Sequence, residues 1–247
     1  MLFRADLHIH SVLSPCGSLE MSPRDIVRTA SEKGVHVIAV TDHNTCAHAP
    51  YIEKLSAEYG ITAFYGMELQ TISETHALCL FGSVEDALHF GDQIYALVPD
   101  VPNNAEVFGD QVEVDENGMI VREETKMLLQ SAEIEIEEAI DMAHAANGLL
   151  FAAHIDRDTF SIISQLGFIR EGLPLDGIEF SKHTSYAKGC ALFSDYCKSY
   201  PVLRNSDAHF LEDIGAAYTI LDMQAPTFNE FKKALIGENG RSIRYDA

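Results

Sequence analysis

The chain has 247 residues, 47% of them hydrophobic, so it is long enough to bury a sizeable core. Its 38 acidic and 17 basic residues give a formal net charge of -21, which opposes attraction to nucleic acid and to anionic membranes. We therefore expect neither long nucleic acid nor a membrane as a partner. The sequence shows no leader and no apolar run long enough to cross a bilayer, and we expect a cytoplasmic protein.

The five cysteines form no CxxC pair and no even framework of the kind that small secreted domains use. They are Cys16, Cys46, Cys79, Cys190 and Cys197. This pattern suits a reducing compartment. We interpret all of them except Cys16 as structural.

Short apolar runs alternate with segments of helical periodicity along the chain. In chain order, strands are expected at residues 5–7, 35–41, 61–68, 77–81, 149–153, 177–181, 202–205 and 218–221. The first helix is expected to begin after Ser22 as N-cap, with Pro23 at its first position and Gly34 after its end. Further helices are expected at 47–59, 84–97, 135–147, 186–199 and 227–236. The alternation predicts an α/β fold with mainly parallel strands, either a closed barrel or an open doubly wound sheet.

Residues 99–125 interrupt this alternation. Two β-prone arms, 111–114 and 119–121, lie on either side of Asn117-Gly118, a pair that favours a tight hairpin turn. We expect a single domain over residues 1–247 with an inserted β-hairpin that shapes the mouth of a pocket.

Histidines and carboxylates recur where the expected strands end. His8 and His10 are two residues apart in an extended segment, so both imidazoles face the same way and can bind one metal ion. The other strand ends supply Asp42, His43, Glu68, His154, Asp207 and His209. Because the carboxyl ends of parallel strands lie on one rim of a barrel, these residues predict a metal cluster. Glu68 is suited to bridge two cations.

Of the other six histidines, His183 follows Lys182 and is ambiguous, and five do not follow this pattern. His76 precedes its expected strand, so it reaches the same rim only if that strand runs against the others. The remaining four have no partner at ligand spacing, and we interpret them as ordinary surface or core histidines: His36, His48, His89 and His144.

Several short motifs occur together in one order. They are Asp6-Leu7-His8-Ile9-His10, Thr41-Asp42-His43-Asn44, Gly66-Met67-Glu68, His76, His154 and Ser206-Asp207-Ala208-His209. In these motifs, which span nearly the whole chain, the sequence resembles the polymerase and histidinol phosphatase (PHP) family. The resemblance implies a distorted, TIM-like, seven-stranded (β/α) barrel with two or three divalent metal ions (zinc, manganese or iron). It also implies hydrolysis of phosphoesters.

The resemblance assigns ligands to each metal. It implies one metal held by His8, His10, Glu68 and Asp207, a second held by Glu68, His76 and His154, and a third held by His43 and His209. The family usually has a histidine or aspartate shortly after the first motif, where this chain has Ser14-Pro15-Cys16. Cys16 either supplies a thiolate ligand, which favours zinc, or is a buried thiol without a role in binding.

The resemblance does not specify a substrate. Because the sequence has no broad basic stripe, we expect a phosphoesterase that attacks a small phosphorylated metabolite or nucleotide with a metal-bound hydroxide. Asp42, Glu68 and His209 are the candidate catalytic side chains. Arg157, Lys182 and Arg204 lie near strand ends and are candidates for binding the substrate phosphate. Two alternatives remain: an amidohydrolase-like enzyme that cleaves a C–N bond with the same metals, and a non-catalytic, metal-binding regulatory module.

Overall fold

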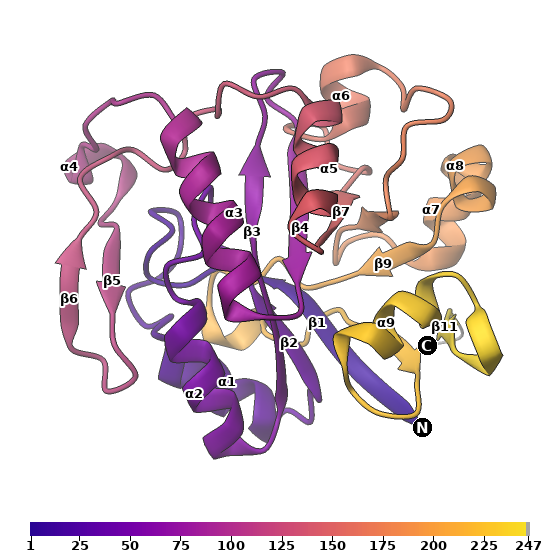
Figure 1. Cartoon of the computed structure of the whole chain (residues 1–247), viewed down its shortest axis with the longest axis horizontal. Coiled ribbons are helices and arrows are strands. Elements are labelled where there is room, and N and C mark those ends of the chain that lie inside the picture. The colour runs from indigo at the N-terminus through magenta and orange to yellow at the C-terminus, as the bar shows by residue number, and fades with distance from the viewer. Residues whose placement is uncertain (246–247) are drawn as a thin grey trace.

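A curved sheet of nine strands forms the framework of residues 1–245, the part of the chain that the computed structural model describes (Figure 1). In the order of hydrogen-bonded neighbours, its strands are β11 (Ser242–Arg244), β10 (Thr219–Asp222), β1 (Leu2–Ile9), β2 (Val37–Val40), β3 (Thr62–Gln70), β4 (His76–Phe81), β7 (Leu149–Ala152), β8 (Gly177–Phe180) and β9 (Val202–Arg204). The fold is therefore α/β with a barrel-like sheet. The expected number of seven strands is wrong, because β10 and β11 extend the sheet beyond β1.

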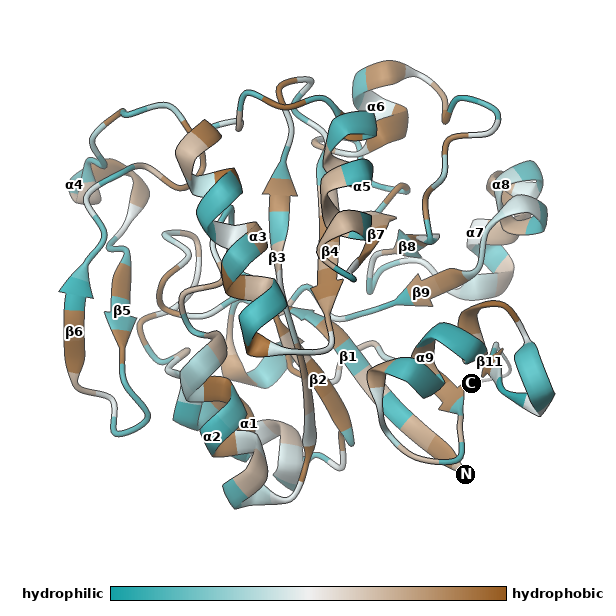
Figure 2. Ribbon diagram, in the orientation of Figure 1, coloured by the Kyte–Doolittle hydropathy of each residue, from teal (hydrophilic) through white to brown (hydrophobic). Residues whose placement is uncertain are grey.

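Helices cover the outside of this sheet, and hydrophobic residues concentrate on the strands that they cover (Figure 2). Their bounds are α1 (Pro23–Glu32), α2 (Ala49–Tyr59), α3 (Val84–Leu97), α5 (Ile136–Ala145), α6 (Ile162–Leu166), α7 (Tyr186–Leu192), α8 (Ser194–Ser199) and α9 (Phe228–Leu235), with short 3-10 turns η1 (Leu211–Asp213) and η2 (Glu238–Gly240). Ser22 caps α1 by accepting the N–H of Asp25 at 3.1 Å. The single helix expected over 186–199 is interrupted at Phe193, which has a non-helical backbone.

The direction of β4 explains the unusual position of His76 in the sequence. β4 runs antiparallel to both β3 and β7, and His76 pairs with Gln70 at the end of β3. A tight turn, in which the N–H of Thr71 donates to the carbonyl of Thr75 at 2.9 Å, joins the two strands. The first residue of β4 therefore lies at the same rim as the last residues of β3.

The interior of the sheet is apolar at one end and polar at the other. Phe64 and Glu68 share a face of β3, and Leu80 and His76 share a face of β4, because residues an even number apart face the same way. On β1 the register against β2 shifts between Asp6 and Ile9. A shift of this kind re-aims side chains next to a functional site.

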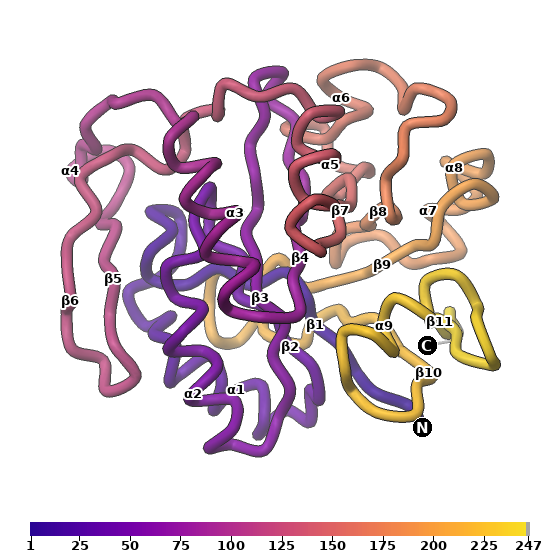
Figure 3. Tube along the Cα trace, viewed as in Figure 1, coloured from indigo at the N-terminus to yellow at the C-terminus, as the bar shows by residue number. Residues whose placement is uncertain are grey.

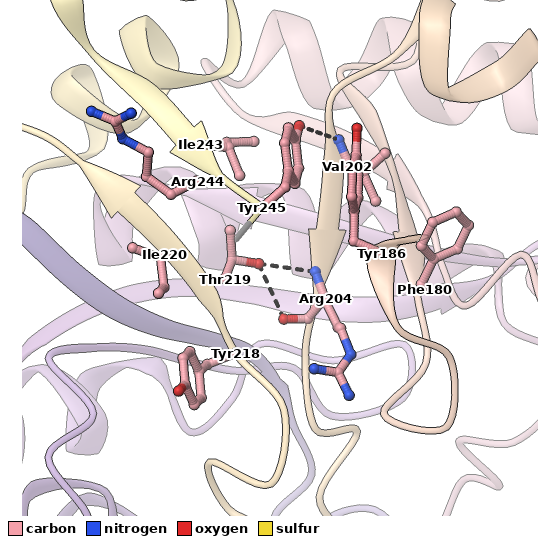
Figure 4. Close-up of a pocket in the computed structure, with 10 residues that line it drawn as sticks. All are labelled: Phe180, Tyr186, Val202, Arg204, Tyr218, Thr219, Ile220, Ile243, Arg244 and Tyr245. Carbon is pink, nitrogen blue, oxygen red and sulfur yellow. Dashed lines mark hydrogen bonds between the residues drawn. The ribbon is translucent and has the colours of Figure 1, made fainter. Parts of the chain in front are cut away.

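The two ends of the sheet meet along a seam between β9 on one side and β10 and β11 on the other (Figure 4). Thr219 Oγ1 accepts from the backbone N–H of Arg204 at 2.9 Å and donates to its carbonyl at 3.1 Å. The hydroxyl of Tyr245 accepts the N–H of Val202 at 3.2 Å. Side-chain hydrogen bonds thus bridge strands that are not neighbours in the ladder, and the seam leaves a small cavity of about 30 Å³.

The segment that interrupts the alternation stands apart from the main sheet. It contains α4 (Ala105–Phe108) and a separate antiparallel pair, β5 (Val112–Val114) and β6 (Ile120–Glu123). Gly118 has a positive φ of 78°, and the carboxylate of Asp115 accepts the N–H groups of Asn117 and Met119 at the turn. In Figure 3 this segment is the outermost part of the trace on the left.

The cysteines differ from the sequence-based expectation. Cys190 on α7 and Cys197 on α8 form a disulfide with a Cα–Cα distance of 5.7 Å. The sequence analysis interpreted both cysteines as structural but did not predict this bond, because two short helices bring together thiols seven positions apart. Among residues 1–245, no helix is both long enough and apolar enough to cross a membrane.

Candidate metal centre

Glu68, near the end of β3, is the centre of a buried histidine cluster. Its side chain is 2% exposed, and five imidazoles approach it. The distances to its carboxylate oxygens are 2.8 Å for His76 Nδ1, 2.8 Å for His154 Nε2, 3.2 Å for His43 Nδ1, 3.3 Å for His8 Nε2 and 3.3 Å for His10 Nε2. The structure thus brings together side chains from β1, β3, β4 and the loops after β1, β2 and β7.

Asp207 places a second carboxylate beside this cluster. Its Oδ1 lies 3.3 Å from His10 Nε2 and 3.6 Å from His8 Nε2, and its Oδ2 accepts from Arg157 Nη1 at 2.6 Å. His209 Nδ1 donates to the backbone carbonyl of Asp207 at 2.9 Å, which leaves His209 Nε2 with a free lone pair.

Several nitrogens of the cluster fit a bound metal ion. Among the described residues, four buried imidazole atoms have no hydrogen-bond partner: His8 Nε2, His10 Nε2, His43 Nδ1 and His154 Nδ1. Buried polar atoms without a partner are costly, and imidazole with carboxylate is a usual donor set for divalent metals. Three groups have possible ligand atoms within 4.8 Å of one another: His8, His10 and Asp207; His43, Glu68 and His76; and His10, Cys16, His43 and His209. The residues present therefore fit a multinuclear site.

The electrostatics of the cluster also suit cations. Burial raises the pKa of Glu68, but the neighbouring His76 and His8 outweigh it and hold the pKa well below its usual range. Burial lowers the pKa of His43 well below its usual value and that of His209 to about 4. Burial also opposes charge on His10, yet the nearby carboxylates of Asp207 and Glu68 outweigh it and raise the pKa of His10 to about 9, so this imidazole gives up a proton when it binds a metal ion. Ionised carboxylates and neutral imidazoles are the forms that bind metals.

Glu179 is a member of the site that the sequence analysis missed. It is the third residue of β8, only 1% exposed, and its oxygens lie 3.1 Å from His8 Nδ1. It also accepts from the N–H of His154 at 2.9 Å and from Asn205 Nδ2 at 2.7 Å. A carboxylate on the far nitrogen of an imidazole fixes the ring and its tautomer. Its signal in the sequence was an acidic residue within an otherwise apolar strand.

Asp42 occupies a different place from the one expected of a catalytic group. It is 2% exposed, and its oxygens accept from Ser11 N at 2.7 Å, Ser11 Oγ at 2.6 Å and Ser14 Oγ at 2.6 Å. Burial raises its pKa, but the nearby imidazole of His48 and the hydrogen bonds from Ser11 and Ser14 outweigh this and hold the pKa below the usual range. These hydrogen bonds of Asp42 thus go to Ser11 and Ser14 in the loop after β1, behind the cluster.

A cavity of about 320 Å³ opens beside Asp207 and His209. Arg157 and Lys182 line it and form ion pairs with Asp207 and with Asp213 (2.9 Å), respectively. The other residues that line it are Ser181, His183, Ser206 and Phe210. Asp207 and His209 belong to both the cavity and the cluster, so the cavity adjoins the cluster.

Arg204 lies elsewhere. Its guanidinium donates to the carbonyls of Thr184 at 3.1 Å and Lys182 at 2.9 Å, and it lines the seam cavity with Tyr218 and Tyr245 (Figure 4). Arg204 therefore supports the loop that carries Lys182 and does not take part in the lining of the larger cavity among the described residues.

Cys16 faces the rim of the cluster next to His10, His43 and His209. The residue is exposed at its surface, so the alternative of a buried thiol is wrong, yet desolvation of the thiol raises its pKa to about 12, and the negative charges of Glu68 and Asp207 add to this effect. The thiol is therefore protonated unless a cation is bound beside it. Cys46 and Cys79 are buried in the core.

Two residues of the cluster have an unusual backbone. His154 and Asp207 have positive φ values of 27° and 49°, which side-chain-bearing residues seldom adopt. Such strain persists only where the surroundings enforce it, and it concentrates at functional sites.

Comparison with known proteins identifies similar sequences. The model of the PHP domain matches residues 6–169, and that of the PHP-associated family matches residues 198–238. The uncharacterized protein YqxK of Bacillus subtilis is 24% identical over 275 residues, covering 97% of this chain and 63% of that protein. The uncharacterized protein MJ1587 of Methanocaldococcus jannaschii is 39% identical over 77 residues, covering 28% of this chain and 44% of that protein. The chain thus spans less than two thirds of each relative.

Solved structures share the fold. The lesion-specific endonuclease Q of Pyrococcus furiosus superposes with a TM-score of 0.74 at 20% identity, covering 98% of this chain and 58% of that chain. Endonuclease Q in complex with a 27-mer duplex containing an abasic lesion superposes with a TM-score of 0.72 at 20% identity and the same coverage.

The second of these structures corrects an expectation. Net charge led us to exclude long nucleic acid as a partner, yet a chain with this fold is bound to duplex DNA at its active site. The exclusion is wrong because a charge summed over the whole chain does not describe one cavity. Here Arg157 and Lys182 line the cavity opposite Asp207 and Asp213, so the local charges balance, and bound cations would make the cavity positive.

Proposed function

The chain belongs to the PHP domain family, and we propose that it is a metal-dependent phosphoesterase. The observation that carries the proposal is a set of buried imidazole nitrogens without partners, gathered around Glu68 and Asp207. Beside it lies a cavity with two basic side chains. Carboxylate and imidazole ligands next to cationic groups are suited to binding and cleaving a phosphoester.

We propose that His8, His10, Glu68 and Asp207 hold one metal ion and that Glu68, His76 and His154 hold another. Cys16, His43 and His209 would hold a third. Divalent ions bound there would neutralise phosphate charge and lower the pKa of water. Zinc, manganese and iron all remain candidates, and Cys16 favours zinc in the third position.

The side chains of this chain have distinct proposed tasks. Glu68 would supply one carboxylate oxygen to each of two metal ions, and His209, whose Nδ1 is used by the Asp207 carbonyl, would hold the third metal ion or accept a proton at the cavity through Nε2. Arg157 and Lys182 bind the phosphate of the substrate. Asp42 positions the loop behind the cluster and does not transfer protons, because its oxygens are taken up by Ser11 and Ser14.

The proposed substrate is a phosphoester carried by a nucleotide, either free or within a strand. Phe210 supports this choice, because it lines the cavity and is 50% exposed. Exposed aromatic side chains next to basic groups provide a stacking surface for nucleobases.

The test is a substrate panel with defined metals. The protein is purified without chelators, its metal content is measured, and turnover is assayed with Mn²⁺ or Zn²⁺. The panel contains p-nitrophenyl phosphate, bis-p-nitrophenyl phosphate, nucleotides, and short DNA and RNA strands with and without an abasic lesion. We expect phosphoester turnover that is lost in His10→Ala and Asp207→Ala with unchanged circular dichroism. Metal binding without any phosphoester turnover would overturn the proposal, and turnover of amide substrates instead would favour C–N hydrolysis.

A further inference from the structure

His48 lies next to the metal centre although its sequence context predicts an ordinary histidine. It precedes α2 and is 2% exposed. The backbone N–H of Val114, in β5 of the inserted segment, donates to His48 Nε2 at 3.1 Å. Because a backbone amide can only donate, Nε2 is the acceptor and the neutral ring carries its proton on Nδ1.

A series of hydrogen bonds runs from His48 toward the metal centre. His48 Nδ1 lies 2.7 Å from Ser11 Oγ and 3.5 Å from Asp42 Oδ2. With the proton on Nδ1, His48 donates to Ser11, and Ser11 Oγ donates in turn to Asp42 at 2.6 Å. Every donor and acceptor in this step is matched, because the hydroxyl has one proton to give and lone pairs to receive.

The same series of hydrogen bonds ends at His10, a proposed metal ligand. Ser14 Oγ gives its only proton to Asp42 Oδ1 at 2.6 Å, so it accepts from His10 Nδ1, 3.0 Å away. A proton on Nδ1 leaves the lone pair of His10 on Nε2. That atom lies 3.3 Å from both Glu68 and Asp207 and has no hydrogen-bond partner among the described residues. The network thus sets the tautomer in which His10 binds metal.

The inserted segment contacts the loop after β1 at other points as well. The N–H of Val112 donates to the carbonyl of Val12 at 3.3 Å. Gly109 packs so closely against Pro15 that an added Cβ would collide with the Pro15 carbonyl. Figure 1 shows β5 next to the loops that follow β1. The hairpin therefore braces the loop from which Ser11, Ser14 and Cys16 project.

We propose that His48 is a positioning residue that couples the inserted hairpin to the metal centre through Ser11, Asp42, Ser14 and His10. Docking of the hairpin completes the hydrogen bonds that orient His10. This inference rests on one part of the proposed function, namely that His10 is a metal ligand.

Zinc affinity of the full-length chain tests this coupling without an assay of turnover. The metal-stripped protein is titrated with Zn²⁺ against a chromophoric chelator, and thermal unfolding is followed in parallel. His48→Phe keeps an aromatic ring but removes both hydrogen bonds, and we expect roughly 10-fold weaker zinc binding. His48→Gln should restore most of the affinity, because its amide oxygen accepts from Val114 and its amide nitrogen donates to Ser11. His89→Gln, at an exposed position of α3, is the matched control and should bind zinc as the wild type does.

Two outcomes overturn the proposal: wild-type zinc affinity in His48→Phe, or no recovery in His48→Gln. If His48→Phe does not fold, the wild-type protein still gives an answer. Long-range ¹⁵N–¹H correlation spectra of the histidine rings should place a proton on Nδ1 of both His48 and His10, and a proton on Nε2 of His48 would contradict the network. A negative phosphoester panel combined with zinc binding that depends on His48 would reject the activity and keep the positioning role.

Discussion

Both carboxylate oxygens of Glu179 lie 3.1 Å from Nδ1 of His8, and both side chains are buried. The pair joins β8 to β1 across the interior of the barrel-like sheet. Among the described residues, His8 Nε2 on the opposite side of the ring has no hydrogen-bond partner and faces Glu68 and Asp207. Glu179 therefore fixes the direction in which His8 presents its lone pair.

Replacing this carboxylate tests its role. Glu179→Gln keeps the shape of the side chain but removes the charge that supports His8, so we expect metal affinity to fall roughly 10-fold to 100-fold. Chelator competition measures the effect, and the exposed Glu171→Gln provides the control. Equal affinities in both variants would show that Glu179 has no influence on the metal centre.

Cys16 offers a test of the third metal. Cys16→Ser should lower the zinc content by about one equivalent relative to the wild type, because a thiolate is the better zinc ligand. Cys16→Asp, which introduces a residue that the family uses at this place, should retain the third metal and shift its preference from zinc toward manganese. Elemental analysis after dialysis against each metal gives the stoichiometry. A wild-type zinc content in Cys16→Ser would remove Cys16 from the ligand set.

Arg157 lines the cavity and contacts a proposed ligand directly, with Nη1 at 2.6 Å from Asp207 Oδ2. Loss of a charge-assisted hydrogen bond costs about 1.5–3 kcal/mol, which corresponds to roughly 10-fold to 100-fold in kcat/KM. We expect Arg157→Ala to lose this much toward any phosphoester that the protein cleaves, and Arg157→Lys to lose less. Steady-state kinetics measure the effect, with Arg170→Ala as a control because Arg170 is exposed and pairs with Glu137. Unchanged kinetics in Arg157→Ala would place the phosphate elsewhere.

Alternation and strand ends were sufficient to predict the α/β class and the rim that holds the cluster. The strand count could not be predicted, because β11 is three residues long and has no distinct pattern. The direction of β4 could not be predicted either. All six of its residues are buried, so they show no alternation of apolar and polar residues that would tell one face of the strand from the other. His76 then provided the only hint, since an antiparallel β4 was the condition under which it could reach the rim.

The roles of His48 and Glu179, which support the metal ligands, could not be predicted from the sequence, because their hydrogen-bond partners are distant in the chain. His48 depends on Val114, 66 positions away, and Glu179 on His8, 171 positions away. The sequence nevertheless contains one indication that Glu179 has polar partners. A carboxylate within a wholly buried strand is too costly to keep without donors, so its position alone implies partners.

The carboxylate of Glu230 predicts a pH dependence of stability far from the metal centre. It accepts from Arg241 at 2.7 and 3.1 Å and from Lys233 at 2.9 Å, which ties α9 to the turn before β11. These hydrogen bonds, that from Arg241 above all, lower its pKa from 4.5 to about 2. Because the folded-state pKa lies below the unfolded value, the contribution to stability is fully present above pH 4.5 and is lost as the pH falls toward about 2.

Glu230→Gln should therefore be less stable than the wild type at about pH 7, and the difference should shrink at about pH 3. Urea unfolding of both proteins at the two pH values measures it, and the difference between variants cancels the acid sensitivity that they share. The exposed Glu20→Gln should show no such difference at either pH. A difference between Glu230→Gln and wild type that stays constant, or grows in acid, would mean that the ionised carboxylate does not hold α9 in place.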